Sequence, residues 1–120
     1  MAPPNEEMDT RSFELRTYVA APGKLDALMA RFRDHTTTLF EKHGIDNIGY
    51  WVATDAEGKP TETLIYLLAH ASRAAAKESW AAFQADPDWV AARAASEVDG
   101  RLTASVTSVY LEPTDFSGLR

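Results

Sequence analysis

The chain has 120 residues, which is enough for one domain and too few for two. Its formal net charge is −6, from 12 basic and 18 acidic residues, and the basic residues are scattered singly, which excludes a concentrated basic face for nucleic acid or for an anionic membrane surface. The absence of cysteine excludes disulfides, thiolate zinc sites, iron–sulfur clusters and a cysteine nucleophile.

Both ends of the chain have the composition of tails. Residues 1–11 are rich in proline and acidic residues and have no hydrophobic periodicity, which predicts a flexible N-terminal tail. Residues 113–120 predict a second, shorter tail. There is no secretory signal pattern and no apolar run near the roughly 20 residues of a membrane helix. We therefore expect a cytoplasmic protein with a single domain over residues 12–112.

The first predicted strand covers residues 12–19, where polar and apolar side chains alternate. Pro22 and Gly23 then end it, since both residues favour turns. Because successive side chains of a strand point to opposite faces, the strand has an apolar face and a more polar one. The apolar face carries Phe13, Leu15, Thr17 and Val19, and the polar face carries Glu14, Arg16 and Tyr18.

Residues 24–43 have the spacing of one amphipathic helix. Gly44 follows directly, as is common just after the last helical residue. His43 lies in the last turn, where a cation suits the helix dipole, so we expect it to cap the helix. The apolar stripe consists of Leu25, Leu28, Met29, Phe32, Thr36, Leu39, Phe40 and His43.

The second half of the chain predicts a hairpin, two helices and a last strand. Strand-like runs at 47–54 and 62–70 flank a turn that contains glycine and proline. Ser72 and Asp86 are favourable N-cap residues for an alanine-rich helix and for a second helix that begins at Pro87. Residues 102–111 alternate again and form the last strand.

The predicted order is therefore β-α-β-β-α-β, the ferredoxin-like arrangement of an α+β protein. Both helices should cover one face of a four-stranded antiparallel sheet and leave the other face bare. We assign Glu14, Arg16 and Tyr18 to the bare face and expect it to be covered by a second copy of the chain. These three residues are thus the predicted dimer interface.

Four segments add a family resemblance. They are FELRTYVAAPGKL, the helix end EKHG, the strand IGYWV and the turn ADPDW, and together they resemble the NIPSNAP family from about residue 12 to residue 113. That family belongs to the dimeric α+β barrel superfamily, so the resemblance implies the same fold and pairing. The biochemical roles of its members are largely undefined. The wider superfamily includes cofactor-free monooxygenases, isomerases, dehydratases and haem-handling proteins, whose sites lie between the sheet and the helices.

The candidate site residues are aromatic side chains and a histidine that a pocket between sheet and helices would bring together. His35 suits general-base work because an unperturbed imidazole titrates near neutral pH, and Tyr18 is the second catalytic candidate; a plain hydrogen-bonding role remains open for His35. The ion pair of Glu14 and Arg16 is either a charged relay inside the barrel or a structural contact at the dimer seam. The predicted pocket lining is Phe32, His35, Tyr50, Trp51, Tyr66 and Trp80.

The three histidines do not predict a metal site. His35 and His43 are about two helical turns apart, roughly 12 Å along the axis, which is too far to share an ion. We expect a structural role for His70 and no resident metal or cofactor, with haem ligation as a remote alternative.

These observations lead to two hypotheses of different classes. The first is a protein that binds a small apolar or aromatic metabolite between sheet and helices, with any chemistry being cofactor-free. The second is a non-catalytic oligomeric scaffold. A monooxygenase-like or haem-binding barrel enzyme is a remote third. Nucleic acid and membrane are not expected as partners.

Overall fold

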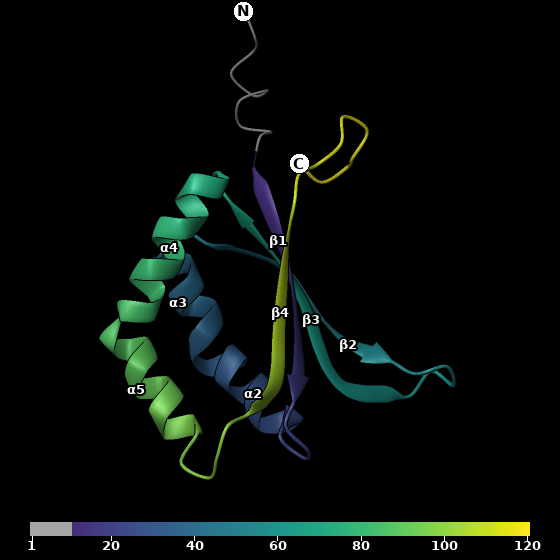
Figure 1. Ribbon diagram of the computed structural model, residues 1–120, viewed down its shortest axis with the longest axis vertical. Coiled ribbons are helices and arrows are strands. Elements are labelled where there is room, and N and C mark those ends of the chain that lie inside the picture. The colour runs from purple at the N-terminus through teal and green to yellow at the C-terminus, as the bar shows by residue number, and fades with distance from the viewer. Residues whose placement is uncertain (1–10) are drawn as a thin grey trace, which may run out of the picture.

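The computed structural model describes residues 11–120 and confirms the predicted element order (Figure 1). Four antiparallel strands form one sheet in the order β2-β3-β1-β4, and the helices lie together on one of its faces. Within the described residues no helix is long and apolar enough to cross a membrane. The tail predicted for residues 1–11 lies outside the described part except for Arg11. The elements are β1 (Ser12–Ala20), α2 (Leu25–Arg31), η1 (Phe32–Thr36), α3 (Thr37–Lys42), β2 (Asp46–Thr54), β3 (Pro60–His70), α4 (Arg73–Ala85), α5 (Pro87–Ser96) and β4 (Thr103–Leu111).

The helix predicted over residues 24–43 contains a π-helical turn, η1, between α2 and α3. The hydroxyl of Thr36 donates to the carbonyl of Arg31 at 3.3 Å, and that of Thr37 donates to the carbonyl of Phe32 at 3.1 Å. These bonds reach back five residues, in step with the wider turn of the backbone. The helix ends at Lys42, and Gly44 follows the cap residue His43 with φ at +79°. A π turn adds one residue to the helical turn. The residues after it are therefore rotated about the helix axis relative to those of a regular α-helix.

Both predicted N-caps are confirmed. The Ser72 hydroxyl accepts from the Ala75 amide at 3.0 Å, and the Asp86 carboxylate accepts from the Asp88 amide at 2.8 Å. The prediction for His43 is corrected: its Nε2 lies 2.7 Å from Asp86 Oδ2, so its side chain joins the first helix to the α5 cap rather than bonding its own helix carbonyls. Hydrogen bonds from Lys42 and His43 hold the pKa of Asp86 well below its ordinary value.

The core lies between the sheet and the helices. A buried arginine, Arg31, helps to close it by donating to Ser96 and Glu97 at 3.1 Å and by lying over the Trp89 ring, which ties α2 to α5. The buried core cluster is Ala20, Leu28, Phe32, Leu39, Phe40, Ile45, Leu64, Tyr66, Leu68, Phe83, Trp89 and Leu102.

The strand register corrects the assignment of the two faces of β1. Glu14 pairs with Leu68 and Tyr18 with Leu64, and both leucines belong to the buried core under the helices. Because directly paired residues share a face, Glu14, Arg16 and Tyr18 point toward the helices and not toward the bare face. The prediction that these three residues lie on the bare face, as the dimer interface, is therefore wrong. The apolar alternates of β1 are the ones that face outward.

The open face of the sheet is largely apolar, although Thr63, Ser105 and Thr107 also point outward. Its members are the outward alternates of all four strands, and Trp51, Val109 and Leu111 remain 55%, 50% and 41% exposed. We call this set the open face: Leu15, Thr17, Val19, Trp51, Ile65, Leu67, Val109 and Leu111.

Candidate functional site

A buried carboxylate lies on the helix-facing side of the sheet, near the start of β1. Glu14 on β1 is 1% exposed, and its two oxygens accept four hydrogen bonds. Oε1 accepts from the Trp80 indole at 2.8 Å and lies 2.8 Å from Nε2 of His70, while Oε2 accepts from Ser108 at 2.6 Å and from Arg16 at 2.8 Å. These five residues, from two central strands, an edge strand and α4, are called the carboxylate network.

The donors of the network keep Glu14 ionised. Burial by itself raises the pKa of Glu14, but the hydrogen bonds from His70, Ser108, Trp80 and Arg16 outweigh it and lower the pKa from 4.5 to about 2. His70 is fully buried as well, and its Nδ1 has no hydrogen-bond partner among residues 11–120. The structural role expected for His70 is thus a contact with Glu14.

Arg16 connects the carboxylate to a layer of phenols. Its Nε donates to the Tyr66 hydroxyl at 2.8 Å and its Nη2 donates to the Tyr18 hydroxyl at 3.0 Å. Its guanidinium also lies 4.3 Å from the ring centroid of Trp80. Burial lowers the pKa of Arg16, but the oxygens of Tyr66, Tyr18 and Glu14 reverse the effect, so its pKa is raised and it stays charged. The two charges are therefore fixed in place inside the fold.

The aromatic side chains next to Arg16 form a packed layer. Tyr66 stacks on Tyr50 with 4.9 Å between ring centroids, and it meets Phe32 edge-on at 5.1 Å and Tyr18 edge-on at 5.3 Å. Burial raises the pKa of Tyr50 and of Tyr66, so both phenols remain neutral. The structure thus brings together Tyr18, Phe32, Tyr50 and Tyr66, four residues that the sequence had singled out.

A small apolar hollow opens beside this layer. It has a volume of about 200 Å³ and lies between η1 and the strands β2 and β3. Asn47 braces it by donating to the Thr37 carbonyl at 2.9 Å and accepting from the Tyr50 hydroxyl. We call it the β2-side hollow; it is lined by Met29, Phe32, Arg33, Thr37, Tyr50 and Leu64.

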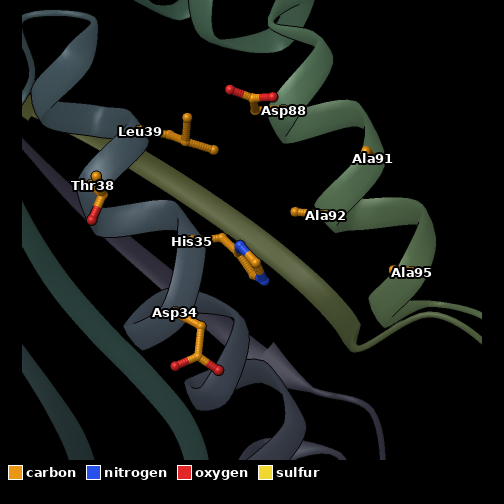
Figure 2. Close-up of a pocket in the computed structure, with 8 residues that line it drawn as sticks. All are labelled: Asp34, His35, Thr38, Leu39, Asp88, Ala91, Ala92 and Ala95. Carbon is orange, nitrogen blue, oxygen red and sulfur yellow. The ribbon is translucent and has the colours of Figure 1, made fainter.

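His35 lies elsewhere. Figure 2 shows it pointing from the first helix toward α5, into a groove of about 520 Å³ between the helices. The imidazole is exposed and forms no hydrogen bond with any residue of the described part. It does not line the β2-side hollow, so its expected place in that pocket is corrected. A catalytic role for His35 stays a prediction. Any reaction that His35 assists would take place in this interhelical groove, which Asp34 and Asp88 also line.

The two remaining pocket candidates also separate. Trp51 lies on the open face, where its ring folds over Gly49 so closely that a Cβ there would come within 2.5 Å of the indole. Trp80 is on the helix side, but its partners are Phe40, Phe83 and the carboxylate network rather than the hollow. Trp51 is therefore removed from the predicted lining, and Trp80 contacts the site through Arg16 and Glu14.

Several residues of the site were not singled out by sequence reasoning. Ser108 looked like one of several hydroxyls on an alternating strand, and only the pairing of β4 with β1 puts it opposite Arg16. Arg33 and Thr37 lie off the expected apolar stripe but line the hollow beside Met29 and Phe32. No group of three or more His, Asp or Glu side chains in residues 11–120 is arranged to hold a metal ion.

The arrangement favours binding over proton transfer. The carboxylate of Glu14 is engaged by four donors that lower its pKa, and burial raises the pKa of Tyr66, whose hydroxyl also accepts from Arg16. Neither of these two groups is therefore poised to exchange a proton near neutral pH. What the site offers a small molecule is an apolar cavity with a rigid, polar rear wall.

Comparison with known proteins gives a consistent picture. The family model described as NIPSNAP matches residues 13–118. A NIPSNAP family protein of unknown function from Agrobacterium tumefaciens has a TM-score of 0.78 at 22% identity, covering 93% of this chain and 96% of the other. Another NIPSNAP family protein from the same organism has a TM-score of 0.77 at 28% identity, covering 92% and 99%. None of the curated proteins matches the chain.

A more distant likeness concerns the fold alone. A Chloroflexus aurantiacus protein named for the antibiotic biosynthesis monooxygenases has a TM-score of 0.58 at 21% identity, covering 92% of this chain and all of its own. It supports the ferredoxin-like α+β fold and carries no statement about chemistry.

Proposed function

The chain belongs to the NIPSNAP family, and from that premise we propose that it binds a small apolar or aromatic molecule in the β2-side hollow. The observation that carries the proposal is the hollow itself, about 200 Å³ of apolar space against the rings of Tyr50 and Phe32, which meet edge-on at 5.6 Å. A cavity of this size suits a molecule of one or two rings, smaller than a typical drug-sized ligand.

The rear of the hollow supports the same proposal. Tyr50 stacks on Tyr66, and Tyr66 accepts a hydrogen bond from Arg16, which is held in turn by Glu14. The wall is therefore pre-ordered, and a ligand would not have to organise it on binding. The protein acts in this proposal as a binding protein, with no reaction assigned.

Filling the hollow tests the proposal. A thermal-shift panel of neutral aromatic probes, such as indole and p-cresol, should raise the melting temperature of the wild type, because ligand that binds only the folded state stabilises it. Met29→Trp places an indole inside the hollow and should weaken the affinity for the same probe at least tenfold.

The matched control is Val98→Trp, which adds the same ring at a position that is 79% exposed and does not line the hollow. It should leave the probe affinity unchanged. The proposal fails if no probe of the panel stabilises the wild type, or if Met29→Trp binds the probe as tightly as Val98→Trp does.

The open face supports a second proposal, that two copies of the chain pair through their sheets. The face carries apolar side chains on all four strands, aliphatic on β1, β3 and β4 and Trp51 on β2, and a contiguous apolar patch of this kind is typical of an interaction surface. Sheet-on-sheet packing about a two-fold axis would cover it, in keeping with the pairing expected from the family resemblance. The alternative function, a non-catalytic oligomeric scaffold, would require only this surface and no ligand.

Charge placed at the middle of the open face should separate the copies. Leu67 lies on the central strand β3, opposite Leu15. Leu67→Lys should raise the dimer dissociation constant at least tenfold in sedimentation equilibrium, because a buried lysine without a partner is costly. Val98→Lys adds the same charge away from the face and should change nothing. A wild type that sediments as a monomer at every accessible concentration would rule out the pairing.

A further inference from the structure

The edge of the sheet at β4 is not covered by the helices. Val106 pairs with Tyr18, so it belongs to the helix-facing side, yet it is 44% exposed. Further along the same side, between β4 and α4, there is a cleft of about 480 Å³. We call it the β4-side cleft; it is lined by Arg73, Ala74, Lys77, Trp80 and Tyr110.

Two cations line the cleft without an acidic partner. The guanidinium carbon of Arg73 lies 3.6 Å from the ring centroid of Tyr110. A guanidinium stacked on a ring keeps its N–H groups free at its edge, in the fork that matches a carboxylate. Lys77 follows one helical turn later, about 6 Å along the axis of α4. Neither side chain forms an ion pair within residues 11–120, although the protein has a net charge of −6.

The nearby carboxylate does not neutralise these cations. Glu14 contacts the rear of the cleft through Trp80, but its oxygens are occupied by the four donors of the carboxylate network and it forms no ion pair with Arg73 or Lys77. The positive charge of the cleft is therefore available to a ligand.

The walls of the cleft are aromatic and held in place. The indole N–H of Trp80 donates to Glu14, which fixes the ring, and Tyr110 is held under Arg73. Burial and the charge of Glu14 raise the pKa of Tyr110, so its phenol stays neutral and adds no negative charge to the cleft. Fixed rings beside two unpaired cations are suited to a flat, anionic molecule.

We propose that the β4-side cleft binds a small aromatic carboxylate, with its carboxylate group between Arg73 and Lys77 and its ring against Trp80. The cleft is separate from the β2-side hollow and shares no lining residue with it. Binding in the β4-side cleft can therefore be tested independently of binding in the β2-side hollow.

Benzoate is the probe, with benzyl alcohol as its neutral counterpart. Isothermal titration of the full chain should show that benzoate binds more tightly than benzyl alcohol and that added salt weakens benzoate alone. Arg73→Gln/Lys77→Gln should weaken benzoate binding at least tenfold. Benzoate should also shift the indole N–H resonance of Trp80 in a ¹H–¹⁵N spectrum.

The control removes two positive charges elsewhere. Lys59→Gln/Arg101→Gln changes two exposed side chains that form no ion pair in the described part, and it should bind benzoate within twofold of the wild type. Met29→Trp should also leave benzoate binding unchanged, which separates this site from the hollow. Absence of benzoate binding to the wild type, or equal affinity in the Arg73/Lys77 and Lys59/Arg101 variants, would overturn the proposal.

Discussion

Replacing Glu14 with glutamine is expected to lower the free energy of unfolding by about 3–5 kcal/mol, the usual cost of removing one partner from a buried ion pair. Glu14 is 1% exposed and Arg16 is paired with it at 2.8 Å. The substitution keeps the shape of the side chain, so the loss reports the hydrogen bonds and the charge rather than a cavity.

Glutamine cannot replace the carboxylate in either orientation. Trp80 donates to Oε1 and Arg16 donates to Oε2, and neither an indole N–H nor a guanidinium can accept a hydrogen bond. Whichever way the amide is turned, its NH₂ group meets one of these donors. One buried donor therefore loses its partner, and Arg16 loses its counter-charge in both cases.

Urea unfolding at a fixed protein concentration measures the effect. Glu57→Gln, in the exposed turn after β2, removes the same charge from the surface and should change the free energy of unfolding by less than about 0.5 kcal/mol. Removing both partners, in Glu14→Gln/Arg16→Met, should cost less than the sum of the single changes because the two residues interact directly. A loss below about 1 kcal/mol for Glu14→Gln would show that the network does not stabilise the fold.

The architecture was predictable because local signals agreed along the whole chain. Alternation marked β1 and β4, the Ser72 and Asp86 caps marked the starts of α4 and α5, and Gly44 marked the end of the first helix. Each of these features depends on neighbouring residues only, which a single sequence contains. The family resemblance agreed with them and is shown by the match over residues 13–118.

The faces of β1 were not predictable by polarity. Alternation showed that Glu14, Arg16 and Tyr18 share a face, but their polar character suggested the bare side. They face the helices because their polar groups are satisfied there by His70 and by residues from β3, α4 and β4. Such partners are distant in the sequence, at separations of 50 to 94 residues, and alternation along one strand contains no information about them.

The candidate site was predictable in part for a similar reason. Phe32, Tyr50 and Tyr66 were identified by their aromatic character and lie together. His35 was misplaced because helical spacing alone does not say whether a residue beside the apolar stripe faces the sheet or the neighbouring helix, and His35 faces α5. Trp51 follows Tyr50 directly and therefore had to occupy the opposite face, but the sequence could not say which of the two faced the helices.

Acid is expected to remove about 3 kcal/mol of stability through Glu14 alone. Its pKa is 4.5 ordinarily and about 2 in the folded protein. At about 1.4 kcal/mol per pKa unit, the difference corresponds to about 3 kcal/mol. Because the folded pKa is the lower one, the unfolded chain binds more protons between these values. The contribution is complete above pH 4.5 and is lost as the pH falls toward 2.

The difference between wild type and Glu14→Gln isolates this contribution, since Asp86 and the other carboxylates titrate in both proteins and cancel. The gap in unfolding free energy between the two proteins should therefore narrow by about 2 kcal/mol as the pH falls from about 6 to 3, and by about 3 kcal/mol once the pH reaches about 2. A ¹³C titration of the Glu14 carboxyl in the wild type gives the same quantity without a variant, and its midpoint should lie near 2. A Glu14 titration midpoint at or above 4.5, or a wild-type-to-variant difference in unfolding free energy that stays constant with pH, would contradict the prediction. It would mean that the effect of burial on the Glu14 pKa outweighs that of the four hydrogen bonds. In that case Glu14 would be able to release and take up a proton at accessible pH, and the network would become a candidate for chemistry rather than a rigid wall for binding.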